Sequence, residues 1–141
     1  MHQEAEAERG ETPQVVLILN PTAGKGRAGR ELVHLRTLLI REGVKADIFL
    51  TRHEGDGRAM VEALDPRPGT LVVAAGGDGT VHEVLNGIMA RAEDDRPALA
   101  LIPTGSGNDT RRTLGVPTDM TDATLTVASG YRRRFDIGLC N

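Results

Sequence analysis

The 141-residue chain has few aromatic side chains and a single cysteine. Tryptophan is absent, and one tyrosine and two phenylalanines cannot build the stacking platforms that bind single-stranded nucleic acid. A formal net charge of −3 also argues against a basic binding surface, so we expect no nucleic-acid partner. With Cys140 alone the chain can form no disulfide framework, which agrees with a cytoplasmic location.

Long apolar runs are also missing. No stretch approaches the roughly 20 apolar residues that cross a bilayer, so we expect no transmembrane segment. Residues 1–13 are polar and acidic and lack the basic start and apolar run of a signal peptide, which indicates a flexible tail. The hydrophobic fraction of 39% nevertheless suits a globular domain.

Short apolar runs alternate with patterns of helical period. The runs predict strands at 15–19, 44–50, 70–75, 98–102 and 134–139. Loops are expected at 22–29 and 51–57, and helices from about Leu32 to Gly43, at 58–64, at 80–91, just before Gly115, and at 121–129. This alternation predicts an α/β fold, a Rossmann-like three-layer domain with a mostly parallel sheet and helices on both faces.

The last predicted strand runs into the end of the chain at Asn141. We therefore expect residues 14–134 to form one domain. Residues 135–141 would begin a second domain that is not present in this chain.

Residues 76–87 read GGDGTVHEVLNG and follow the apolar run 71–75 directly. Glycines let the backbone approach a ligand closely, and the start of a helix supplies unpaired N–H groups and partial positive charge. A phosphate group is therefore the expected occupant of this corner. Asp78, between two glycines, is placed to meet a metal–phosphate group, although a tight turn capped by Thr80 is a structural alternative.

Two further glycine-bearing loops follow predicted strands, with the sequences NPTAGKG at 20–26 and PTGSGND at 103–109. In an open α/β sheet, ligands bind outside the carboxyl ends of the strands, and all three loops are expected at that edge. The first loop lacks the Ser or Thr that a P-loop carries after its lysine, and it is not GxGxxG. A dinucleotide-binding Rossmann site is therefore a poor fit.

The motifs NPTAGKG, GGDGTVHEVLNG and PTGSGND, in this order, resemble the catalytic domain of the diacylglycerol kinase family over residues 15–139. That family includes sphingosine kinases, ceramide kinases and soluble bacterial lipid kinases. The resemblance implies the N-terminal, ATP-binding domain of a two-domain lipid kinase that transfers the γ-phosphate of ATP to a lipid hydroxyl, most simply that of diacylglycerol. It implies ATP and Mg²⁺ as cofactors and a cytoplasmic enzyme at a membrane surface, and it leaves a homodimer open.

Carried onto this sequence, the resemblance assigns Asp78 a catalytic role and implies nucleotide contacts from all three loops and from the end of the second strand. Ser106 stands where the family usually has threonine, and its hydroxyl is expected to keep that role. The implied nucleotide-binding residues are Asn20, Pro21, Thr22, Ala23, Gly24, Lys25, Thr51, Gly76, Gly77, Asp78, Gly79, Thr80, Val81, Glu83, Ser106 and Asn108.

Several of these residues also have ordinary structural explanations. Lys25 either balances phosphate charge or is a solvated loop lysine. Glu83 either orders the phosphate loop or simply occupies the first turn of its helix, where a carboxylate is favourable. His82 is expected to be exposed and without a role. His34 and His53 have no partners at metal-ligand spacing, so the sequence indicates no zinc site.

Two other functions stay open. A NAD kinase-like enzyme would share GGDGT, although the flanking NPTAGKG and GSGND motifs favour the lipid kinase. A non-catalytic nucleotide-binding module is the other alternative. In the resembling family a second domain supplies the lipid pocket, a structural Mg²⁺ site and the proposed general base, so we expect this chain alone to have little kinase activity.

Overall fold

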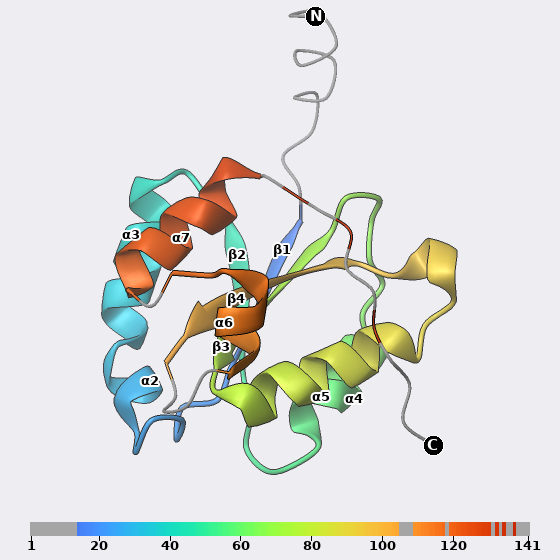
Figure 1. The fold of residues 1–141 in the computed structure, drawn as a ribbon, viewed down its shortest axis with the longest axis horizontal. Coiled ribbons are helices and arrows are strands. Elements are labelled where there is room, and N and C mark those ends of the chain that lie inside the picture. Colours follow the sequence, from blue (N-terminus) through green and yellow to red (C-terminus); the bar gives the residue numbers. More distant parts are fainter. Residues whose placement is uncertain are drawn as a thin grey trace, which may run out of the picture.

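The computed structural model describes residues 14–104, 109–117 and 119–130, together with Arg132, Arg134 and Ile137. A sheet of four parallel strands in the order β2-β1-β3-β4 forms its centre (Figure 1). The strands are β1 (Val15–Leu19), β2 (Ala46–Leu50), β3 (Leu71–Gly76) and β4 (Ala98–Pro103). The predicted α/β class and parallel sheet are confirmed. Most of the strand predicted at 134–139 lies outside the described residues, and neither Arg134 nor Ile137 is in a strand.

Helices cover both faces of the sheet, as the alternating pattern predicted. One face carries α2 (Arg27–Arg30), α3 (Leu32–Arg41) and α7 (Met120–Ser129), and the other carries α4 (Asp56–Glu62) and α5 (Asp78–Met89) (Figure 1). A 3₁₀ turn, η1 (Glu93–Asp95), precedes β4, and α6 (Asp109–Leu114) follows it. In the described part of the chain, no helix is both long and apolar enough to cross a membrane.

The central strands are apolar throughout because both of their faces are buried. In β1, Leu17 packs with the α3 and α7 side chains, whereas Val16 and Ile18 pack with those of α4 and α5. The same alternation runs along β3. Side chains two residues apart share a face of a strand, so one continuous apolar run supplies both halves of the core.

Three helices begin elsewhere than the periodicity predicted. Helix α5 begins at Asp78 instead of residue 80, α4 begins at Asp56 instead of residue 58, and α2 lies inside the segment predicted as a loop. Glycines set these starts: Gly55 and Gly77 are the N-caps of α4 and α5. The four-residue α2 is too short to show a helical period. The predicted end of α3 is confirmed, since Gly43 follows it with a φ of 71°.

Hydrogen bonds hold the turn between β2 and α4 at both ends. At its start, the amide of Thr51 donates to the carbonyl of Leu19 at 2.9 Å. At its end, the Asp56 carboxylate accepts the amides of Arg52 (2.7 Å) and His53 (3.1 Å) and lies 2.9 Å from Nδ1 of His53. The hydrogen bond from Arg52 is the main cause that lowers the pKa of Asp56 below the ordinary value of 3.8, and it outweighs the partial loss of water around the carboxylate.

The central strand provides a direct test of the core. Leu17 is fully buried, and Leu17→Ala is expected to lower the free energy of unfolding by about 2–5 kcal/mol, because the lost contacts leave a cavity. Val33→Ala on α3 is the matched control, since Val33 is 75% exposed and its truncation should change stability by less than about 0.5 kcal/mol. Urea unfolding measures both, and equal midpoints for the two variants would contradict the assigned core.

The Asp56 turn makes a pH prediction. Since its pKa is lower in the folded chain, ionised Asp56 stabilises the fold above pH 3.8, and this contribution is lost as the pH falls through the lowered value. A carboxyl-carbon NMR titration should give Asp56 a pKa below 3.8. In Asp56→Asn the amide shifts of Arg52 and His53 should stop responding in this range. Titration of Asp56 at or above its ordinary pKa would rule out the bonded turn.

Candidate functional site

The strand order places the starts of the loops that follow β1, β3 and β4 side by side at one edge of the sheet. From β1 the chain leads to α2 and α3 on one face, and from β3 it leads to α5 on the other, so the loops diverge between these neighbouring strands. This switch point is where open α/β sheets bind ligands. Backbone hydrogen bonds join the loop starts: Asn20 N–H to the Ala75 carbonyl at 3.2 Å, and Thr104 N–H to the Gly76 carbonyl at 3.2 Å.

The first loop is tightly wound against the end of β4. Gly24, Lys25 and Gly26 have consecutive positive φ values of 61°, 59° and 85°. Gly24 has no room for a Cβ, because it would meet the carbonyl oxygen of Thr104. Arg30 supports the strained residue by donating to the Lys25 carbonyl at 3.1 Å. A non-glycine residue in this region costs about 1–3 kcal/mol, so the surrounding contacts hold Lys25 in place.

Residues of this loop make two kinds of hydrogen bond. Asn20 folds its Oδ1 back onto Thr22, accepting from the amide at 3.1 Å and the hydroxyl at 2.8 Å. The carbonyls of Pro21 and Ala23 accept amides of α2 instead. The carbonyls of Pro21 and Ala23 thus hold the loop against α2.

The glycine-rich segment forms the start of α5. Thr80 does not cap the helix, contrary to the structural alternative. Its side chain is buried against Gly76, and a Cβ on Gly76 would overlap it. Gly77 is the N-cap, with an extended backbone (φ −93°, ψ −166°) and no side chain to bond the first N–H groups. Asp78 and Gly79 lie in the first turn. The helix N-terminus therefore faces the loops without a side-chain cap.

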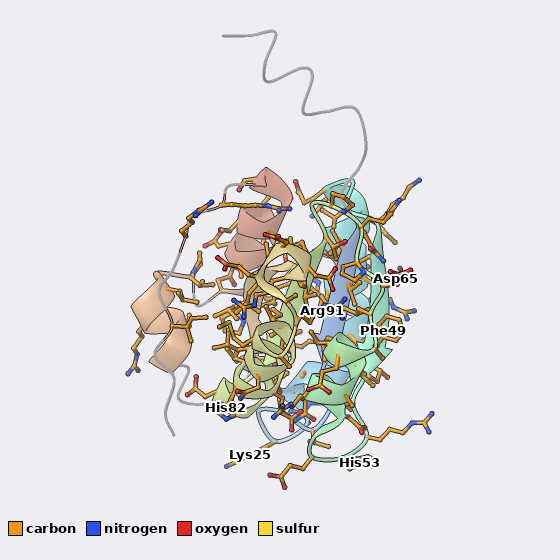
Figure 2. All side chains as sticks on the ribbon, turned by 90° about the vertical axis from the view of Figure 1, so that its right-hand side faces the viewer. Lys25, Phe49, His53, Asp65, His82 and Arg91 are labelled. Carbon is orange, nitrogen blue, oxygen red and sulfur yellow. The ribbon has the colours of Figure 1, made fainter. Side chains whose placement is uncertain are left out.

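A hollow of about 360 Å³ lies between the loop that follows β1, the loop that follows β2 and the start of α5. Figure 2 shows Lys25, His53 and His82 at this end of the molecule. All of the lining residues are polar or glycine: Asn20, Thr22, Thr51, Arg52, His53, Glu54, Gly79, Thr80, His82 and Glu83. A larger hollow of about 1020 Å³ borders α3 and the amino ends of β1 and β2, away from the glycine-bearing loops.

Glu83 has a different role from either one predicted. It lies in the second turn of α5, so the helix-start explanation was wrong. Its Oε1 accepts the Gly55 amide at 2.7 Å and its Oε2 accepts the Gly57 amide at 3.0 Å. The carboxylate thus binds the loop that precedes α4, and it orders that loop directly.

The structure gathers only some of the predicted nucleotide-binding residues around the hollow. Val81 lies on the face of α5 that is buried in the core, so its side chain cannot contact a ligand. Ser106 and Asn108 lie outside the described residues. The sequence analysis did not assign Arg52, Glu54 or the two histidines to the site; their only signal was adjacency to Thr51 and Glu83. The predicted residues that line the hollow are Asn20, Thr22, Thr51, Gly79, Thr80 and Glu83.

Comparisons with known proteins agree on one family. The profile of the diacylglycerol kinase catalytic domain matches residues 14–140. The diacylglycerol kinase of Staphylococcus haemolyticus is 37% identical over 125 residues, covering 89% of this chain and 37% of that protein. The Bacillus subtilis diacylglycerol kinase is 36% identical over 126 residues, covering 89% and 41%.

Solved structures agree with the sequence matches. A crystal structure of a diacylglycerol kinase from Bacillus anthracis str. Sterne superposes with a TM-score of 0.71 at 34% identity, covering 84% of this chain and 42% of that one. The chain thus spans about two-fifths of the length of these relatives. By its motifs, its fold and these matches, the chain belongs to the diacylglycerol kinase catalytic domain family.

Proposed function

We propose that this chain binds ATP at the carboxyl edge of its sheet and is the nucleotide-binding part of a lipid kinase. The polar hollow between the start of α5 and the loops that follow β1 and β2 carries this proposal. Its lining offers hydroxyl, amide, imidazole and charged groups, which suit a nucleotide. An acyl chain would leave these polar groups without water or hydrogen-bond partners, at a cost in free energy.

The start of α5 fits the phosphate end of the nucleotide. Its first N–H groups have no side-chain cap, and Gly77 leaves their approach open. The dipole of this 12-residue helix adds partial positive charge at the same point. Lys25, exposed at this end of the molecule, would add a full positive charge. These groups would bind and orient the phosphates.

Asp78 is the residue that would hold Mg²⁺ beside the phosphates. It is partly buried in the first turn of α5, next to Gly77. Among the described residues, no group of three His, Cys, Asp or Glu side chains could hold a metal ion together. A divalent ion here would take oxygen ligands from Asp78 and from the phosphates. Mg-ATP would supply the transferable phosphoryl group, and transfer depends mostly on positioning and charge neutralisation.

The lipid side of the reaction is proposed for the remainder of a longer protein. The curated relatives named diacylglycerol kinase are more than twice as long as the matched region. We propose diacylglycerol as the simplest acceptor and the cytoplasmic surface of a membrane as the place of reaction. NAD kinase activity is the competing proposal, because the segment GGDGT alone does not separate the two.

Gly77 provides a test of nucleotide binding. Gly77→Val is expected to abolish Mg-ATP binding, because the new side chain would fill the space in front of the first N–H groups of α5. The variant should still fold, since φ −93° and ψ −166° suit any residue. Calorimetry at millimolar nucleotide measures binding, and thermal unfolding checks the fold. Gly77→Ala adds only a methyl group and should bind with intermediate affinity; full binding by a folded Gly77→Val would show that the phosphates lie elsewhere.

Phosphate transfer from labelled ATP tests the substrate class. The full-length protein that contains this chain is expected to phosphorylate diacylglycerol or a sphingoid base in mixed micelles and to leave NAD unlabelled. The 141-residue chain alone should transfer no phosphate to lipid, because its polar hollow offers no surface to an acyl chain. Transfer to NAD with unlabelled micelles would overturn the lipid assignment. Transfer to lipid by the chain alone would overturn the proposal that the remainder of a longer protein binds the lipid.

A further inference from the structure

Three residues spaced by four contact α4: Glu83 and Gly87 on α5, and Arg91 two residues beyond the end of that helix. Residues four apart lie on the same side of a helix, so Glu83 and Gly87 share the face of α5 that meets α4, and Arg91 follows in the turn after the helix. The short helix α4 therefore meets a carboxylate, a glycine and a guanidinium in succession along its neighbour. Each of the three makes a different contact with it.

The carboxylate lies at the amino end of α4. Glu83 accepts the amide of Gly55, which is the N-cap of α4, and the amide of Gly57 in its first turn. A negative charge at this end also complements the helix dipole. Gly57 has no room to spare, because a Cβ there would lie 2.8 Å from Oε2 of Glu83. The fit between this carboxylate and the loop backbone depends on glycine at position 57.

The other two residues hold the middle and the carboxyl end of α4. At Gly87 a Cβ would lie 2.7 Å from Cβ of Val61 and 2.9 Å from the carbonyl oxygen of Arg58, so the two helices touch here. Arg91, whose side chain is 12% exposed, donates to the carbonyls of Val61 at 3.2 Å and Glu62 at 3.1 Å. A positive charge thus lies at the carboxyl end of α4 and a negative charge at its amino end.

Only the Glu83 end of this contact borders the candidate site. Residues 51–54, which precede α4, form one wall of the polar hollow, and Thr80 and His82 on α5 form the opposite wall. Both carboxylate oxygens of Glu83 already accept loop amides. Its geometry therefore suits holding the two walls together more than contacting a phosphate.

We propose that Glu83 is a positioning residue for the nucleotide, which sets the distance between the loop at 51–57 and the phosphate-binding start of α5. This inference rests on the proposed nucleotide function. A carboxylate has two acceptor oxygens for the two amides, whereas glutamine has one acceptor and one donor group. Aspartate keeps the charge but is one methylene shorter, so it cannot reach both amides from α5.

The test compares Glu83→Gln, Glu83→Asp and Gly57→Ala with the matched control Arg91→Gln. The first three disturb the carboxylate contact, and the control loosens the far end of α4 instead. We expect the first three to weaken Mg-ATP binding about tenfold, the scale of one lost charge-assisted hydrogen bond, and the control to stay within about twofold. The amides of Gly55 and Gly57 should exchange with deuterium faster in the first three than in the wild type and the control.

The outcomes separate the two proposals. If the folded wild-type chain binds no nucleotide, the proposed function fails and this role fails with it. If the wild type binds and Glu83→Gln binds equally well, only the positioning role is overturned. Equal losses in Glu83→Gln and Arg91→Gln would also overturn it, because they would show a general effect of loosening α4. Full binding in Gly57→Ala with a loss only in the Glu83 variants would indicate direct contact of Glu83 with the nucleotide.

Discussion

The site depends on the register of β1 with its two neighbours. Leu19 pairs with Leu50 of β2 on one side and with Ala75 of β3 on the other, so the three strands end at the same level. As a result, backbone hydrogen bonds join the chain at the ends of these strands: Asn20 donates to the Ala75 carbonyl, and Thr51 donates to the Leu19 carbonyl. Burial of both faces of β1 fixes this register, because a slip by one residue would exchange the side chains between the two halves of the core.

The strands β1 to β4 and the loops that follow β1, β2 and β3 could be predicted from the sequence, whereas the starts of α4 and α5 could not. The apolar runs of β1 and β3 are unambiguous because their residues are buried on both faces of the sheet. Helix starts depend on local backbone geometry. Gly77 is the N-cap of α5, and it precedes the apolar residues whose spacing predicts this helix. The role of Glu83 was missed because its partners lie 26 and 28 residues earlier in the chain, beyond any local pattern.

Acidic residues of α5 have separate tasks according to what surrounds them. Asp78 lies beside the glycine N-cap, where the helix dipole favours an anion or a metal–phosphate group. Glu83 lies one turn further, where glycine backbone is close enough to donate two hydrogen bonds. The same helix therefore carries one carboxylate at its start, which we propose for the ligand, and another that binds the protein's own loop, although both are acidic residues of one short motif.

The polarity of the hollow also limits which ligands it can hold. The residues that line the hollow are all polar or glycine. Such walls suit phosphate and ribose groups, because they offer hydrogen-bond partners in place of the water that these polar groups lose on binding. A lipid acceptor needs an apolar surface for its chains, and it must present only its hydroxyl at this edge. Under the proposed function, the hydroxyl would meet the nucleotide while the acyl chains stay outside the hollow, and a domain of this polarity would supply one half of a two-substrate reaction.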